Sequence, residues 1–350
     1  MEAIKSPDWN VVGILGAARG ARPDAGAATG TEHLLAGLTT AKGPARGALA
    51  AQGVTRTVLL TVLRDRAHGD DAWSADDDSA TTVVSKDVLG EDGDGRSHFT
   101  GAAARALTSA MTHARREGAK KFGAEHLLRG LLEEDNRAVE LLAACGLTPQ
   151  AVGEGLDGGP EGDPTSGPGG EEDSLGPLLH ATRDMLLGRD HYRRMPLWTR
   201  WTVRFSGINW ASLPSSWVRL ETYEQARRLG DDVVGTEHVL LAVLATHEVA
   251  RTYPHLARES APGHEARYSG GERLARLGID HASVYGALTA GAGARLTADA
   301  RSVEEYVGEE PGPNLESSTD PGTGPLVETL LSEETRARQL IEALTGTGGA

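Results

Sequence analysis

The chain repeats one short motif three times, and this repeat constrains the fold more than any other feature. The copies read GTEHLLAGL from Gly30, GAEHLLRGL from Gly123 and GTEHVLLAV from Gly235. The downstream spacing matches as well, because Gly53 and Gly146 each follow the histidine of their copy by twenty residues. Such self-similarity is typical of chains built from repeated supersecondary units.

Two copies have diverged. In the third copy Gly278 follows His238 by forty residues, which predicts an insertion of about twenty residues within 246–271. A fourth copy begins at Gly322-Thr323, but Gly-Pro replaces Glu-His there.

Each copy has the pattern of short helices. Leucines follow the motif at helical spacing, and Thr31 is expected to be an N-cap, with Glu32 favouring the helix N-terminus. Gly146 is expected at a left-handed C′ position, and Thr148-Pro149 at the start of another helix. Residues 102–116 form a further amphipathic segment, and no period-two run predicts a strand. The predicted fold class is all-α.

The net charge of −15 is concentrated in two segments. Residues 70–94 hold nine acidic residues against one lysine, and residues 154–173 hold seven acidic residues and no base. Both segments are poor in large apolar residues, so they are expected to be solvated spacers, and their charge argues against nucleic-acid binding.

Other sequence features bear on the compartment. No apolar run approaches 18 residues and the N-terminus lacks a signal-peptide pattern, so neither a membrane span nor secretion is expected. A single cysteine, Cys145, fits a reducing environment. We therefore expect a cytoplasmic protein.

These repeats resemble the Clp N-terminal repeat, which precedes the ATPase modules of bacterial Clp (Hsp100) unfoldases. The resemblance rests on Gly-Thr-Glu-His, the leucine-rich helix after it and the closing Leu-Gly pair. It implies two tandem Clp N-type domains, each a pseudo-twofold pair of four-helix repeats. No Gly-Lys-Ser/Thr occurs in the 350 residues, so the phosphate-binding loop of the ATPase modules is absent from this sequence.

The implied domain boundaries follow from the copies. A first domain spans 1–156, with repeats at 8–66 and 97–156 joined by the acidic linker 70–94. An acidic Gly/Pro linker covers 157–174. A degenerate second domain spans 175–350, with repeats at about 200–290 and 295–346.

The resemblance implies a ligand site at the signature glutamates, Glu32, Glu125 and Glu237. In the family this glutamate holds the guanidinium of phosphoarginine, and a carboxylate can accept two parallel N–H bonds from that planar group. Hydroxyls and helix amides can receive the phosphate. The hydroxyl candidates are Thr31, Thr236, Thr100 and Ser212, and in the first repeat Pro7 is expected to replace the threonine. The alternative is that the glutamates only stabilise helix N-termini.

Cyclic-peptide antibiotics also bind the family domain, and Phe99 matches an aromatic of that surface. Ala104 and Thr108 depart from the family pattern nearby, and the alternative for Phe99 is a core position. The predicted function is a non-catalytic binding protein for phosphoarginine or degron peptides, or a decoy for such antibiotics. The alternative is an adaptor or anti-adaptor that contacts a Clp ATPase or its regulators.

No catalytic, cofactor or metal site is predicted. Arg251 and Tyr268 stand where a zinc-binding His-Glu-x-x-His motif needs its second histidine. The repeated histidines are expected to pack at repeat interfaces and to bond to the backbone. Cys145 lies among apolar residues without a readable base, which favours a buried thiol over a nucleophile.

The segment 183–219 combines seven arginines with four of the six tryptophans. Arginine and tryptophan are enriched in protein interfaces, and the combination also suits single-stranded nucleic acid or a membrane surface. The alternatives are a repeat helix whose tryptophans fill the core, or a segment that docks on the acidic linkers.

Overall fold

The computed structural model describes residues 6–24, 26–68, 73–158, 175–193, 209–257, 264–308 and 320–346. The chain divides into two compact units, Met1–Glu172 (unit 1) and Asp173–Ala350 (unit 2). The prediction of an all-α protein is confirmed, apart from one small sheet. Among the described residues, no helix has the length and apolar character needed to cross a membrane.

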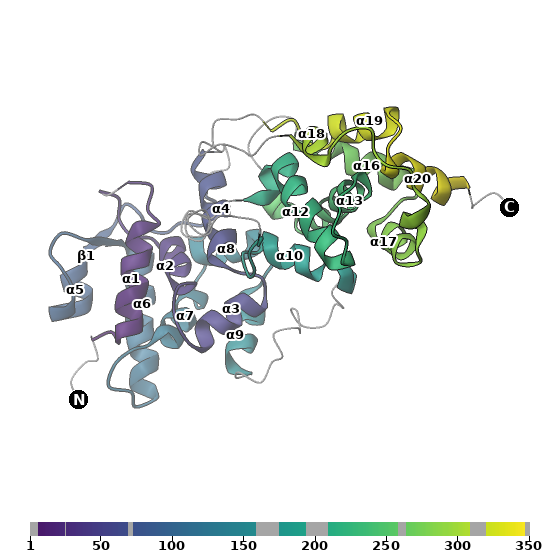
Figure 1. The fold of residues 1–350 in the computed structure, drawn as a ribbon. Coiled ribbons are helices and arrows are strands. Elements are labelled where there is room, and N and C mark those ends of the chain that lie inside the picture. The colour runs from purple at the N-terminus through teal and green to yellow at the C-terminus, as the bar shows by residue number, and fades with distance from the viewer. Residues whose placement is uncertain are drawn as a thin grey trace. The chain divides into compact units, whose positions relative to one another are not determined.

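Unit 1 contains two consecutive groups of four helices, drawn from purple to blue in Figure 1. The first group comprises α1 (Trp9–Gly20), α2 (Thr31–Leu38), α3 (Pro44–Ala51) and α4 (Arg56–His68). The second comprises α6 (Gly101–Arg116), α7 (Ala124–Leu132), α8 (Arg137–Ala144) and α9 (Pro149–Asp157). Gly53 and Gly146 both have positive φ after the third helix of their group, so the predicted left-handed C′ position of Gly146 is confirmed.

The two groups pack in the same way. In α2 and α7 a glycine meets the backbone of the preceding long helix. A methyl group on Gly37 would lie 2.5 Å from Ile14 O, and one on Gly130 would lie 2.4 Å from Ala106 O. Only glycine permits this close approach. Both groups share one leucine- and alanine-rich core.

The expectation that residues 70–94 are a solvated spacer is wrong for much of their length. The segment contains β1 (Thr82–Val84), α5 (Ser85–Leu89) and η1 (Gly90–Asp92). β1 pairs antiparallel with β2 (His98–Thr100), and Val83 lies opposite Phe99. Asp77 has no exposed surface, because three hydrogen bonds from threonine groups replace its water. Bonded neighbours, rather than composition, therefore decide the position of this carboxylate.

Unit 2 begins with η2 (Pro177–Leu179), α10 (His180–Leu186) and η3 (Trp210–Ser212), drawn in teal and green in Figure 1. The following elements are α12 (Pro214–Leu229), α13 (Thr236–Thr252), α14 (Pro254–Ala257), α15 (His264–Arg267), α16 (Ser269–Arg276) and α17 (His281–Thr289). The last are η4 (Ala292–Arg295), α18 (Val303–Val307), α19 (Gly324–Ser332) and α20 (Arg336–Gly346). The predicted insertion is confirmed, because α13 runs nine residues beyond the motif copy and α14 and α15 precede α16.

Part of the arginine- and tryptophan-rich segment is core. Trp210 and Trp217 are buried, and the indole N–H of Trp217 donates to the hydroxyl of Tyr192 at 2.7 Å. That hydroxyl donates to the buried carboxylate of Glu221, also at 2.7 Å. These two tryptophans therefore fill the interior of unit 2. Trp198 and Trp201 lie outside the described residues.

Candidate functional site

The first turn of each motif helix has one recurring geometry. Glycine is the N-cap, and its N–H donates to Nδ1 of the histidine three residues later, at 3.0 Å for Gly30, 2.8 Å for Gly123 and 3.0 Å for Gly235. The expectation that Thr31 is the N-cap is therefore wrong, because the helix begins at that residue. The prediction that the histidines bond to the backbone is confirmed. The signature glutamate is thus the second residue of each helix.

Glu32 is buried, with 3% of its surface exposed. Its Oε1 lies 3.6 Å from Nη1 of Arg137, the first residue of α8, and its Oε2 has no hydrogen-bond partner among the described residues. Burial, reinforced by the nearby Asp77 carboxylate, raises the pKa of Glu32 to about 7. The Glu32 carboxyl group is therefore enclosed beside Arg137, where the two repeats of unit 1 meet.

A buried aspartate bonds to the threonine beside Glu32. The Asp77 carboxylate accepts from the backbone N–H and the hydroxyl of Thr31, and at 2.6 Å from the hydroxyl of Thr100. The Thr31 hydroxyl also accepts from Ala138 N at 3.2 Å. The hydroxyls of Thr31 and Thr100, expected to receive a phosphate, are thus occupied by a carboxylate of the same chain.

Unit 2 repeats this arrangement around Glu237. The Thr236 hydroxyl donates to Asp299 at 2.6 Å and accepts from Ala337 N at 3.0 Å. Nε of Arg336, the first residue of α20, donates to Glu237 Oε2 at 2.8 Å. The two arginines, Arg137 and Arg336, therefore hold equivalent positions against equivalent glutamates.

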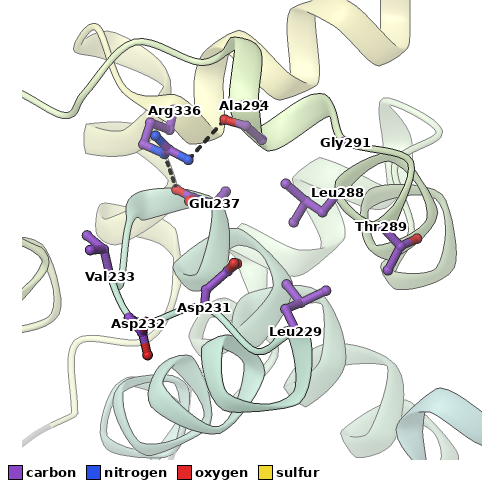
Figure 2. Close-up of a pocket in the computed structure, with 11 residues that line it drawn as sticks. Leu229, Asp231, Asp232, Val233, Glu237, Leu288, Thr289, Gly291, Ala294 and Arg336 are labelled. Atoms are coloured by element: carbon purple, nitrogen blue, oxygen red, sulfur yellow. Dashed lines mark hydrogen bonds and ion pairs between the residues drawn. The ribbon is translucent and has the colours of Figure 1, made fainter.

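Glu237 lines a cleft of about 620 Å³. Figure 2 shows the Glu237–Arg336 pair beside this cleft, with Leu288 and Thr289 projecting from α17. The lining residues are Leu229, Asp231, Asp232, Val233, Glu237, Leu288, Thr289, Gly291, Gly293, Ala294 and Arg336. A signature glutamate of unit 2 is thus part of a cavity wall.

Of the three signature glutamates, Glu125 is the most exposed. It is half-buried, and no ion pair joins it to another described residue. Pro44 corresponds to Arg137, because Pro44 is the first residue of α3 and Arg137 is the first residue of α8. A methyl group on Gly43 would lie 3.3 Å from Glu125 Oε1. The carboxylate therefore faces a glycine instead of a guanidinium.

Asp8 lies next to Glu125. A methyl group on Gly123 would lie 3.1 Å from Glu125 Oε2 and 3.2 Å from Asp8 Oδ2. Trp9 follows Asp8 and has 86% of its surface exposed. Asp8 and Glu125 thus lie close together, and the exposed Trp9 directly follows Asp8 in the chain; we call these three residues the Glu125 surface.

The structure corrects the alignment of the threonine position. The backbone of Thr29 bridges to Phe99, and in the same way that of Phe122 bridges to Pro7. Pro7 therefore corresponds to Phe99, and Asp8, which caps α1, corresponds to Thr100, which caps α6. The first repeat has a carboxylate, rather than a proline, where the second has a hydroxyl.

Two further candidates are interior residues. Phe99 has 1% of its surface exposed and belongs to the core of unit 1. Ser212 is buried in η3, where its hydroxyl donates to Asn209 O at 2.7 Å. The structure thus gives Phe99 a packing role and gives the Ser212 hydroxyl a backbone partner.

Sequence reasoning missed the two arginines and the two aspartates, of which Asp77 is buried and Asp299 is half-buried. One signal was available for the arginines, since Asn136-Arg137-Ala138 and Thr335-Arg336-Ala337 are similar tripeptides at helix starts. No comparable signal marks Asp77 or Asp299, which come from segments without a common pattern.

The remaining candidates are the single thiol and the groups that could bind a metal. Burial raises the pKa of the Cys145 thiol to about 12, so the thiol is protonated at neutral pH. The described residues include no group of three or more metal-ligating side chains suited to an ion.

Comparison with known proteins identifies one domain. Residues 98–180 match the family model described as the Clp repeat (R) N-terminal domain. The match covers the second repeat of unit 1 and the segment that follows it, and it includes no ATPase module. A search of curated proteins returned no match.

Proposed function

We propose that the chain is a non-catalytic binding protein of the Clp system that recognises peptides through a basic side chain, because residues 98–180 match the Clp repeat (R) N-terminal domain. The proposed site is the Glu125 surface. The ligand is an arginine side chain in a degron-like peptide.

One observation carries the proposal. Glu32 and Glu237 each have a guanidinium of their own chain beside them, whereas the equivalent Glu125 is half-buried and has no such partner among the residues that the structure describes. The same first-turn geometry that accepts Arg137 and Arg336 is therefore available at Glu125 for a guanidinium from another molecule. A carboxylate and a guanidinium form charge-assisted hydrogen bonds, which are among the stronger ones in proteins.

The neighbours of Glu125 favour a cation. Asp8 adds a second carboxylate, and the exposed ring of Trp9 can stack on a guanidinium. A phosphoarginine would bring its phosphate close to Asp8, and like charges repel. We therefore propose that unmodified arginine binds more tightly than phosphoarginine.

The test is isothermal titration of the full chain with an arginine peptide, its phosphoarginine form and its citrulline form. Citrulline keeps the shape of arginine but lacks the charge. Glu125→Gln should weaken arginine binding by about 1.5 to 3 kcal/mol, which is roughly ten- to a hundredfold. The matched control is Glu154→Gln on α9. Equal affinities for the arginine and citrulline peptides would refute the proposal. Tighter binding of the phosphoarginine peptide than of the arginine peptide would refute the proposed preference for unmodified arginine.

A second candidate function is contact with a Clp ATPase as an adaptor. Trp9 and Val12 are both exposed on α1, and exposed large apolar side chains are a feature of protein-binding surfaces. Co-purification with a Clp ATPase that is lost in Val12→Asp, while peptide binding is retained, would favour this function.

A further inference from the structure

The outer face of α1 is apolar and exposed. Trp9 and Val12 have 86% and 44% of their surface exposed, and Gly13, Gly16 and Gly20 are exposed as well. At 3.6 residues per turn these five residues lie in one stripe along the helix, which we call the α1 face. None of them is charged, and they stay exposed beside every element that the structure describes.

The composition of α1 is that of a covered helix. Only Asn10 and Arg19 are polar among its twelve residues. The Asn10 amide exchanges two hydrogen bonds with the backbone of Lys42, and the Arg19 guanidinium pairs with Asp94 at 2.7 Å. Both polar side chains are thus held within unit 1. A helix that is apolar on all sides is normally buried on all sides.

The equivalent helix of the second repeat has the outer face of a solvated helix. With Asp8 aligned on Thr100, Arg105 and Thr108 of α6 stand where α1 has Gly13 and Gly16. The Arg105 guanidinium donates to Glu134 at 2.9 Å and to Asp78 at 3.0 Å. The two repeats share one plan, so the apolar α1 face is a property of α1 and not of the repeat.

The glycines of the α1 face are not required by the packing of unit 1. A methyl group on Gly13 or Gly16 would meet no atom within 4 Å, whereas one on Gly37 would meet Ile14 O. A glycine inside a helix lowers its stability relative to alanine. Glycine on an exposed face does, however, permit another backbone to approach closely. These glycines therefore favour contact with a second helix.

The shape of the α1 face is complementary to itself. The large side chains, Trp9 and Val12, lie in the first turn, and the glycines leave a hollow along the rest of the helix. Two copies of α1 that run antiparallel about a twofold axis place Trp9 between Gly16 and Gly20 of the other copy. Val12 then lies between Gly13 and Gly16. Such packing of side chains into gaps is the usual geometry of paired helices.

The charges at the two ends of α1 favour the same arrangement. Asp8 caps the start of the helix, and Arg19 lies in its last turn. An antiparallel pair sets the acidic end of one copy against the basic end of the other, and opposite charges attract. It also opposes the two helix dipoles. A partner of a single charge sign would leave one end unmatched.

We propose that the α1 face binds the same face of a second copy of this chain, with the two α1 helices antiparallel. The contact between two such short helices is small, so the dissociation constant is expected at roughly 10 to 100 µM. The inference does not rest on the proposed function. Trp9 belongs to both surfaces, so the pairing is tested without peptide and with variants outside the Glu125 surface.

The experiment is sedimentation equilibrium of the full chain from about 5 to about 500 µM, a range that brackets the expected dissociation constant. The apparent mass should rise from 36.7 kDa toward twice that value. Gly16→Arg sets like charges in the contact and should weaken pairing at least tenfold. Gly47→Arg is the matched control, because Gly47 is also exposed inside a helix and its methyl position is equally open.

Two results overturn the proposal. One is a mass of 36.7 kDa at every concentration, which leaves the α1 face to a different protein. The other is an equal effect of Gly16→Arg and Gly47→Arg on the apparent mass. A rise in mass that only Gly16→Arg abolishes supports the proposal.

Cysteine cross-linking tests the direction of the two helices. Near the twofold axis Gly13 lies beside Gly13 of the other copy, whereas the two Gly20 residues lie about 20 Å apart. A disulfide needs Cα atoms within about 7 Å. Oxidation should therefore link Gly13→Cys into a covalent dimer but not Gly20→Cys, with the wild-type chain and its single Cys145 as the background. Any other pattern on a non-reducing gel overturns the proposal.

Discussion

The backbone N–H of Ala138 donates a hydrogen bond to the hydroxyl of Thr31, and this bond joins the two repeats of unit 1. The residues are 107 positions apart in the sequence. The same bond joins Ala337 to Thr236 in unit 2. In both units the threonine hydroxyl donates a hydrogen bond to an aspartate, buried Asp77 in unit 1 and half-buried Asp299 in unit 2, so one hydroxyl connects three segments of the chain.

Replacement of this hydroxyl should destabilise unit 1. Thr31→Val keeps the side-chain shape but removes one of the two acceptors of the Ala138 N–H, which keeps Asn136 Oδ1, and removes one donor from the buried Asp77 carboxylate. We expect a loss of about 1 to 3 kcal/mol in the free energy of unfolding, the cost of unsatisfied buried polar groups. Urea unfolding followed by circular dichroism measures it. Thr112→Val, at an exposed hydroxyl of α6, should change the value by about 0.5 kcal/mol or less. Equal effects of the two substitutions would refute the structural role.

The buried Glu32 should make stability depend on pH. Its pKa is about 7 in the folded chain because burial and Asp77 disfavour the charged form, and its ordinary value is 4.5. Between these values the folded state binds more protons than the unfolded state at this residue. Its contribution to stability is therefore fully present below pH 4.5 and is lost as the pH rises to 7.

A variant separates Glu32 from its neighbours. Glu32→Gln should be close to wild type at pH 5 and more stable by about 2 to 3 kcal/mol at pH 8, since the neutral amide avoids burying a charge. The comparison with wild type is needed because burial lowers the pKa of His33 to about 4, which gives the opposite slope over much of the same range. Urea unfolding at both pH values gives the difference. A stability difference that does not change with pH would contradict the raised pKa.

Two glycines should respond oppositely to the same substitution. Gly146 has φ of +77° at the end of α8, so Gly146→Ala should cost about 1 kcal/mol through strain in the left-handed region. Gly153 lies inside α9, where a methyl group meets no atom within 4 Å. Gly153→Ala should stabilise the chain by about 0.5 to 1 kcal/mol, because it restricts the unfolded chain without strain. Thermal unfolding of the two variants checks the pair, and a shift in the same direction for both would refute this assignment.

Several features of the fold could be predicted from the sequence because they depend on neighbouring residues. The helix pattern, the left-handed Gly146 and the helix start at Thr148-Pro149 follow from spacing within a few residues. The acidic segment could not be predicted this way. Its composition is that of a spacer, yet the bonds from Thr31 and Thr100 hold Asp77 in the interior.

The same distinction between local sequence and distant contacts applies to the candidate site. The sequence by itself determined that Glu32, Glu125 and Glu237 are equivalent first-turn residues, since the motif repeats and its histidine fixes the helix start through a bond over three positions. Only the tertiary structure decided which of them is open. Arg336 reaches Glu237 across 99 residues, whereas Pro44 stands at the equivalent position near Glu125 and supplies no guanidinium. These contacts arise where one repeat packs against the next, and the periodicity of either repeat alone does not specify which side chain the other will present.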